Sequence, residues 1–242
     1  MNSDIAVGDT ALWPNLEKMS RYAHTASNPS PRLVHKEIHM SASSVPELLL
    51  ASRSEIRAAL LRNAGVPFSV LTAPVDEEAL RLGLEAEGAT PREMADHLAE
   101  FKAAKVARKN PDKLVLGCDQ VLDFDGRALA KPRDPQEASR QISLMSGKRH
   151  DLYSATVLFH EGRPVWRHIG HVRMTMRHLS AGYIDDYVTR NWDEIRHCVG
   201  GYQLESEGAR LFASVEGDFF TVLGLPLLPL LDHLVARGIL ET

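Results

Sequence analysis

The sequence predicts an α/β protein built on a mixed β-sheet. Apolar segments of strand length alternate with segments of helical periodicity, which is typical of α/β proteins. Two pairs of strand-like segments are separated by short turns, Asp125-Gly126 and Glu161-Gly162, and such turns join antiparallel strands. Because hairpins occur among strand–helix units, the sheet should contain both parallel and antiparallel pairs.

Length and composition favour one globular domain that begins near Pro46. The chain has 242 residues, of which 44% are hydrophobic and 25% charged, with no internal repeat and no Gly/Ser-rich linker. We therefore expect one continuous domain of two lobes over residues 46–242. Residues 1–45 show no sustained period and are expected to form a disordered extension. Met40 within this segment offers an alternative start of translation.

Charge, hydropathy and cysteine content exclude several classes of function. The 28 basic and 32 acidic residues give a net charge of −4, which leaves no basic excess to bind nucleic acid. No apolar run could span a bilayer, and the N-terminus lacks a signal-peptide pattern. We expect a cytoplasmic protein without a membrane partner, in which Cys118 and Cys198 are reduced.

The first half of the domain reads as three strands and two helices. Strands are predicted at 48–51 and 68–71, around a helix that follows Ser52-Arg53-Ser54 and is stopped by Gly65. Residues 75–88 read as a looser acidic stretch. A helix over 91–108 is indicated by the capping box of Thr90 and Glu93. A buried strand follows over 114–124 and leads into the turn at Asp125-Gly126.

The second half reads as a helix, a long hairpin and two further helices. Asp134-Pro135 begins a helix that Gly147 ends, and long strands are predicted at 152–160 and 165–176. A helix covers 180–190. Gly200-Gly201 and Gly224-Leu225-Pro226 bound a last strand-like segment, which precedes a C-terminal helix ending at Ala236.

The start of the first helix is a candidate anion site. Ser54 is placed to cap this helix, whose free N–H groups would face an anion. Arg57 in the first turn opposes the helix dipole by roughly 0.3–1 kcal/mol, a conflict that a bound phosphate would relieve. The alternative is that Arg57 pairs with Glu55 or points to water.

Further candidates lie on the central helix, the buried strand and the loops after it. Lys102 and Lys105 both border the apolar stripe of the helix, and periodicity does not choose between them. Asp119 and Gln120 interrupt the buried strand. Lys131 is held extended by the proline after it. Two acidic residues near Gly200-Gly201, Glu205 and Glu207, are either ligands or solvated charges. No P-loop, Rossmann or nucleophile-elbow motif occurs.

Six segments in register give the chain a specific resemblance. LLLASRSEIRAALLRNAGVPF, VDEE, LAEFKAAKVA, VLGCDQVLDFDGRALAKPRDPQEA, LMSGKRH and EGDFFTVLGLPLLPLLDHL occur in the order found in the Maf-like nucleotide pyrophosphatases. The resemblance implies an elongated α/β fold with a nucleotide cleft between two lobes, similar to the inosine triphosphate pyrophosphatases. It also implies cleavage of a nucleoside triphosphate to the monophosphate and diphosphate with Mg²⁺ or Mn²⁺, and a possible homodimer.

The resemblance also assigns roles to residues. Ser54 and Arg57 match the family's S-x-R-R turn, Lys102 its K-A lysine and Lys131 its lysine before proline, which together would bind phosphate. Asp119 matches the proton acceptor. Glu77 matches the acid of the V-D-E motif, and the two carboxylates would also hold the metal ion.

Three positions of the family motifs bear on the base. The dTTP/UTP branch has Arg, Thr and Gln where this sequence has Ile56, Gln120 and Glu205. Gln120 and Glu205 resemble the branch acting on 7-methyl-GTP, whereas Ile56 replaces that branch's aromatic residue and Glu55 replaces its proline. The resemblance thus favours 7-methyl-GTP. The alternatives are a dTTP/UTP pyrophosphatase, or a nucleotide-binding regulator of cell division with incidental hydrolysis.

Overall fold

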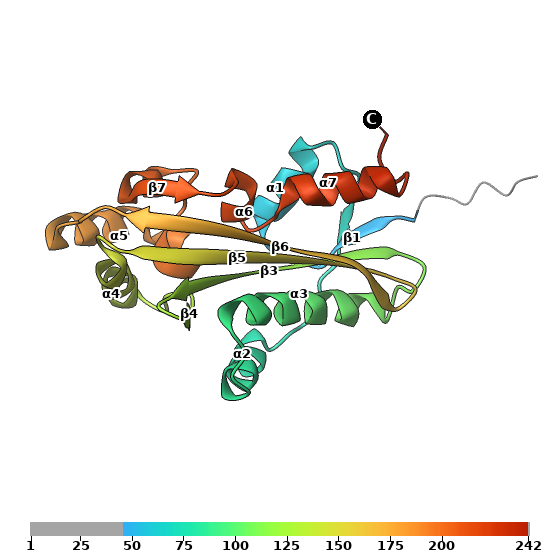
Figure 1. The fold of residues 1–242 in the computed structure, drawn as a ribbon, viewed down its shortest axis with the longest axis horizontal. Coiled ribbons are helices and arrows are strands. Elements are labelled where there is room, and N and C mark those ends of the chain that lie inside the picture. Colours follow the sequence, from blue (N-terminus) through green and yellow to red (C-terminus); the bar gives the residue numbers. More distant parts are fainter. Residues whose placement is uncertain (1–45, 242) are drawn as a thin grey trace, which may run out of the picture. The chain divides into compact units, whose positions relative to one another are not determined.

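The computed structural model describes residues 46–241 and contains one mixed sheet of seven strands. The strand order is β2-β1-β3-β5-β6-β7, and β4 pairs with β3 (Figure 1). The strands are β1 (Leu48–Leu50), β2 (Ser69–Val70), β3 (Leu114–Phe124), β4 (Arg127–Leu129), β5 (Arg149–His160), β6 (Arg163–Met176) and β7 (Phe212–Glu216). Because β1 runs parallel to β2 and β3 while the other pairs are antiparallel, the predicted mixed α/β class is confirmed.

Seven α-helices flank the sheet in residues 46–241. They are α1 (Glu55–Asn63), α2 (Glu77–Ala86), α3 (Pro91–Ala107), α4 (Pro135–Met145), α5 (Ala181–Ile195), α6 (Phe219–Val222) and α7 (Leu227–Ala236). Two 3₁₀ turns, Val199–Gly201 and Glu207–Leu211, lie between α5 and β7. No helix in this part of the chain is long and apolar enough to cross a bilayer. Residues 1–45, including the predicted extension and Met40, lie outside the described residues.

Local sequence signals explain most of these elements. The side chain of Thr90 accepts from the Glu93 N–H, and Glu93 reciprocates at Thr90, so the predicted capping box of α3 is confirmed. Both turn residues of the first hairpin have positive φ, 52° at Asp125 and 78° at Gly126. This is the conformation that two-residue hairpins with right-handed twist require.

Two predicted elements need correction. The acidic stretch expected to be loose forms helix α2, because the Asp76 side chain caps Ala79 N at 3.0 Å and Glu77 lies in the favourable first turn. Helix α5 continues past Arg190 to Ile195. Its extra turn is retained because Ile195 is 1% exposed within the apolar core, where burial outweighs local end signals.

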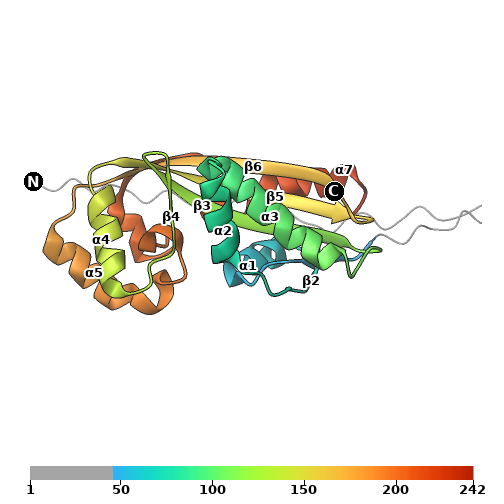
Figure 2. The same ribbon diagram turned by 90° about the horizontal axis from the view of Figure 1, so that it is seen from below.

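Helices cover both faces of the sheet. In Figures 1 and 2, α3 crosses one face, while α1 and α7 lie on the other. Strand β3 contributes alternate residues to the two faces: Leu114, Leu116 and Cys118 pack toward α1 and α7, whereas Val115 and Val121 pack toward α3. Alternation therefore directs Asp119 to the α3 face and Gln120 to the opposite face.

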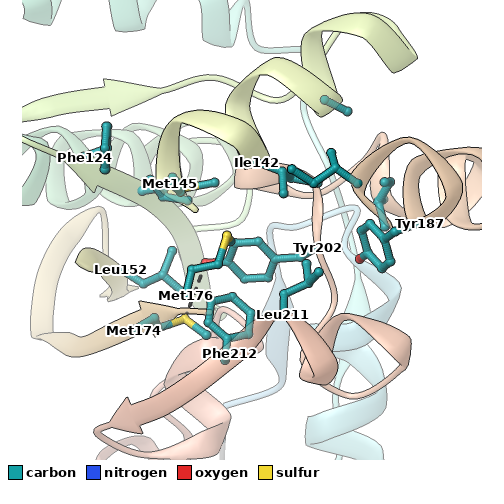
Figure 3. Close-up of a cluster of buried hydrophobic side chains, with 14 of the residues drawn as sticks. Phe124, Ile142, Met145, Leu152, Met174, Met176, Tyr187, Tyr202, Leu211 and Phe212 are labelled. Atoms are coloured by element: carbon teal, nitrogen blue, oxygen red, sulfur yellow. Dashed lines mark hydrogen bonds between the residues drawn. The ribbon is translucent and has the colours of Figure 1, made fainter. Parts of the chain in front are cut away.

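A separate apolar cluster fills the part of the domain formed by α4, α5 and the ends of β5, β6 and β7. Figure 3 shows its buried side chains, including Met174, Tyr187 and Phe212. Tyr202 lies at its centre, where its hydroxyl donates to Met174 Sδ at 3.4 Å and contacts His150 Nε2 at 2.7 Å. Because Tyr202 also lines a cleft, this cluster forms one wall of that cleft.

The sheet has a gap beside β3. Strand β1 pairs with β3 only at Leu114–Leu116, and β4 pairs on the same side only at Leu122–Phe124. Between these pairings, the only strand partner of residues 117–121 within the described part of the chain is β5. The gap exposes Asp119 and Gln120 to the cleft although their side chains point to opposite faces.

Candidate active site

A cleft of about 990 Å³ opens at this gap. Its walls come from the start of α1, from α2 and α3, from β3, and from the end of α5 with the segment that follows it, up to Glu205. The structure brings to this one cleft all the residues to which the resemblance assigns a role: Ser54, Ile56, Arg57, Glu77, Lys102, Asp119, Gln120, Lys131 and Glu205. Segments far apart in the chain therefore converge on a space of the size that nucleotide ligands occupy.

At the base of the cleft, Lys102 bridges two carboxylates. Its ammonium lies 2.5 Å from Asp119 Oδ1 and 3.0 Å from Glu77 Oε2, and Asp119 is only 8% exposed. Lys105, three residues further along α3, donates instead to the carbonyl of Pro74 and does not line the cleft. Tertiary packing thus decides between the two lysines that periodicity left equivalent.

The Lys102–Asp119 contact depends on an unusually close approach of α3 to β3. A Cβ at Gly117 would lie 2.2 Å from Ala99 O and 2.8 Å from Ala103 Cβ. Only glycine leaves room for the helix at this point. Gly117 precedes Asp119 by one strand repeat and faces α3 with it, so the same close packing brings Lys102 to Asp119.

The charges around Glu77 favour its ionised form. Partial burial is the largest single effect and raises the pKa of Glu77. The charge and hydrogen bond of Lys102, together with the charges of Lys131 and Arg53, outweigh it, so the pKa lies below its usual value. Arg53 approaches Glu77 at 3.8 Å. The cleft therefore keeps Glu77 negatively charged among cations at neutral pH.

At the start of α1, Arg57 is fixed by backbone carbonyls. Its Nε donates to Gly224 O at 2.7 Å, and its Nη1 donates to Cys118 O at 3.0 Å and to Ser52 Oγ at 3.2 Å. The expected alternative of a pair between Arg57 and Glu55 is wrong, because Glu55 contacts Arg62. Among residues 46–241, no group accepts from Nη2, so this nitrogen remains able to bind an anion.

Ser54 acts as the predicted N-cap of α1, since its side chain accepts from Arg57 N at 3.5 Å.

Of the two acidic residues near Gly200-Gly201, Glu205 is exposed at the cleft. Glu207 is engaged elsewhere: it accepts from Arg190 at 2.7 Å and from Asn191 at 2.9 Å. The interpretation of Glu207 as a ligand therefore loses its basis. Its hydrogen bonds instead connect the 3₁₀ turn Glu207–Leu211 to α5.

Sequence reasoning missed two serines that support the site. Ser52 accepts from the Arg57 guanidinium, and Ser154 in β5 bonds the side chain of Gln120 at 3.0 Å. The polar turn Ser52-Arg53-Ser54 was a usable signal for Ser52. Nothing in the local sequence around Ser154 indicates a partner 34 residues away on β3, because strand register decides that contact.

The donor set fits a divalent cation. Residues 46–241 contain no cluster of three or more His, Cys, Asp or Glu side chains able to hold a metal ion. However, Glu77 and Asp119 both reach the Lys102 ammonium, so two carboxylates converge on one point. Mg²⁺ is commonly bound through one or two carboxylates together with substrate phosphates. Glu77 and Asp119 are the residues that would hold it.

Comparisons with known proteins identify the family of this chain. The family model described as Maf-like protein matches residues 47–237. A "Nucleoside triphosphate pyrophosphatase" of Ruegeria sp. (strain TM1040) is 56% identical over 80% of this chain and 98% of its own length. A "7-methyl-GTP pyrophosphatase" of Brucella abortus biovar 1 (strain 9-941) is 48% identical over 78% of this chain and 94% of its own length. The chain therefore belongs to the Maf-like family.

Proposed function

We propose that this protein hydrolyses 7-methyl-GTP to 7-methyl-GMP and diphosphate. The coarser activity follows from the close relatives that are named for it: the protein is a nucleoside triphosphate pyrophosphatase, a hydrolase of acid anhydrides. The assignment of 7-methyl-GTP rests on the relatives that carry that name and on Gln120 and Glu205.

One observation supports the chemistry above all others: the placement of Asp119, Glu77 and Lys102 within ion-pair distance at the base of the cleft. In the proposed reaction, Asp119 accepts a proton from the water that attacks phosphorus. Lys102 holds the Asp119 carboxylate in place through their ion pair before substrate arrives. A bound Mg²⁺ or Mn²⁺, held by Glu77 and Asp119, would offset the charge of the phosphate oxygens.

The cations of the cleft are placed to bind the triphosphate. Arg57 presents Nη2 beside the N-terminus of α1, where Ser54 caps the helix and free backbone N–H groups favour an anion. Lys131, which also lines the cleft, contributes a further positive charge. Since Arg57 is held by its hydrogen bonds before binding, it would stabilise the developing charge without reorganisation.

Glu205 supports the choice of a guanine base. Its carboxylate can accept hydrogen bonds from the N1–H and the amino group of guanine, and methylation at N7 adds a positive charge that a carboxylate favours. Uracil and thymine offer a single donor between two acceptors. Each mismatched polar group buried by the wrong base should cost about 1–3 kcal/mol.

A hydrolysis panel tests this proposal. The wild type and the double variant Gln120→Thr with Glu205→Gln are assayed for diphosphate release from 7-methyl-GTP, GTP, UTP and dTTP with Mg²⁺ or Mn²⁺. We expect the wild type to prefer 7-methyl-GTP, and the double variant to lose kcat/KM on 7-methyl-GTP while gaining it on UTP or dTTP. A wild type that prefers UTP or dTTP would refute the proposed substrate. Turnover of no nucleotide would favour the binding regulator.

A further inference from the structure

The side-chain amide of Gln120 is held in one orientation. Its nitrogen Nε2 lies 3.0 Å from Ser154 Oγ, 3.1 Å from Thr221 O and 2.9 Å from Val222 O. Ser154 stands directly opposite Gln120 in the β3–β5 register, and the two carbonyls belong to α6. One amide nitrogen thus joins β3 to both β5 and α6.

The chemistry of these partners determines which end of the amide faces them. The carbonyls of Thr221 and Val222 can only accept hydrogen bonds. The hydroxyl of Ser154 donates its single proton to Thr221 O at 2.7 Å, so it can only accept from Gln120. An amide oxygen turned toward these groups would meet three acceptors. The nitrogen must therefore face α6, and the oxygen Oε1 must face away.

The oxygen of Gln120 is open to the cleft. Gln120 lines the cleft, and among residues 46–241 no group donates to Oε1. Oε1 is also absent from the buried polar atoms that lack a partner in this part of the chain, so it is accessible. Gln120 consequently offers a substrate a hydrogen-bond acceptor and withholds its donor.

The partners that fix this orientation are themselves rigid. Ser154 and Thr221 are both fully buried, and Asp218 caps α6 by accepting from Thr221 N at 2.9 Å. Gly170 in β6 lets α6 approach the sheet, since a Cβ there would lie 2.5 Å from Thr221 Oγ1. The acceptor is therefore preorganised, which lowers the entropic cost of base recognition.

We propose that Ser154 is a positioning residue for base selection, which holds Gln120 so that Oε1 accepts a hydrogen bond from the nucleobase. This inference rests on the proposed function for the location of the base. With Glu205, the cleft then presents two acceptors to the base. Guanine carries two adjacent donors, N1–H and the 2-amino group, whereas the pairing edges of uracil, cytosine and adenine each carry donors at one position. The arrangement selects guanine-type bases.

Substrate analogues that lack one donor test this inference. The kcat/KM values for GTP and 7-methyl-GTP are compared with those for ITP and 7-methyl-ITP, which lack the 2-amino group, and for 1-methyl-GTP and 1,7-dimethyl-GTP, which lack N1–H. In the wild type, we expect removal of the donor that Gln120 binds to lower kcat/KM at least about tenfold, because a buried acceptor stays unpaired.

Two variants of β5 separate positioning from general stability. Ser154→Ala removes one of the three acceptors that orient the amide and loosens its fixed position. It should reduce the discrimination against the analogue that lacks the donor bound by Gln120 by about 3–10-fold, mainly through a change in KM. Thr156→Val is the matched control. Thr156 is equally buried on the same face of β5, donates to His168 O at 3.3 Å and does not line the cleft. Loss of the Thr156 hydroxyl should change the free energy of unfolding without changing the ratio of kcat/KM between a guanine nucleotide and its analogue.

The outcomes distinguish this inference from the proposed function. If Ser154→Ala and Thr156→Val have equal substrate ratios, or if the wild type hydrolyses guanine nucleotides without discriminating against the analogues, the inference is wrong and the proposed function stands. If discrimination is observed but N7 methylation brings no gain, the inference stands and the proposed substrate is wrong. Preference for UTP or dTTP over every guanine nucleotide overturns both.

Discussion

Replacing Gly117 by alanine should separate α3 from β3 and disconnect Lys102 from Asp119. The new methyl group would sit 2.2 Å from Ala99 O and 2.8 Å from Ala103 N, and ordinary contact begins near 3.4 Å. Relief requires a movement of about 1 Å, because the obstructing atoms belong to the backbone and cannot rotate away. We expect a loss of about 1–3 kcal/mol in the free energy of unfolding, as is typical of overpacked cores.

The turnover of Gly117→Ala should fall by more than the loss of folded protein accounts for. Lys102 lies on α3 about one turn after Ala99 and directly before Ala103, so a movement of that size would stretch the 2.5 Å contact between its ammonium and Asp119. Misplacement by about 1 Å costs up to about 100-fold in rate. The assay is diphosphate release at saturating nucleotide, under conditions where denaturant titration shows the variant to be folded.

Gly83→Ala supplies the matched control for this variant. Gly83 lies within α2, and a Cβ there would meet no atom within 4 Å. Alanine in a helix interior should stabilise the protein by about 0.5–1 kcal/mol relative to glycine. A Gly117→Ala protein with wild-type stability and wild-type turnover would refute the argument that this close approach positions Lys102.

Three further variants test the catalytic carboxylate, the buried histidine and the N-terminal segment. Asp119→Asn should lower kcat by at least about 100-fold while the circular dichroism spectrum stays unchanged, because the volume is conserved and the proposed proton acceptor is lost; near-normal turnover would contradict the proposed role. Burial lowers the pKa of His150 to about 4 from 6.5, so its stabilising contribution is complete above pH 6.5 and is lost toward pH 4. This loss amounts to about 3 kcal/mol in the free energy of unfolding. The variant His150→Gln should no longer show it when the free energy of unfolding is measured against pH. An unaltered pH dependence in this variant would exclude His150 as the source. Deleting residues 1–39 should leave melting temperature and turnover nearly unchanged, since the family match begins at residue 47 and the Ruegeria relative is covered over 98% of its length; a large loss in either would show that this segment supports the domain.

The residues that line the cleft could be singled out one by one from the sequence, but their mutual arrangement could not. The neighbouring residues mark three positions as candidates: a helix start at Ser54, an interrupted buried strand at Asp119 and a proline-restricted loop at Lys131. Periodicity did not choose between Lys102 and Lys105, because both border the same stripe of α3, and only the resemblance singled out Lys102. That choice depends on the close packing at Gly117, which joins residues far apart in the chain.

The sequence by itself determined the fold class, the hairpins and the capped helix α3, because turn conformation and helix capping depend on residues within a few positions of one another. Tertiary structure decided the rest. The gap beside β3, the orientation of the Gln120 amide and the separate duties of Glu205 and Glu207 all depend on which distant segments lie side by side. Hydrogen-bond partners across strands are set by register and packing, and no local pattern encodes them.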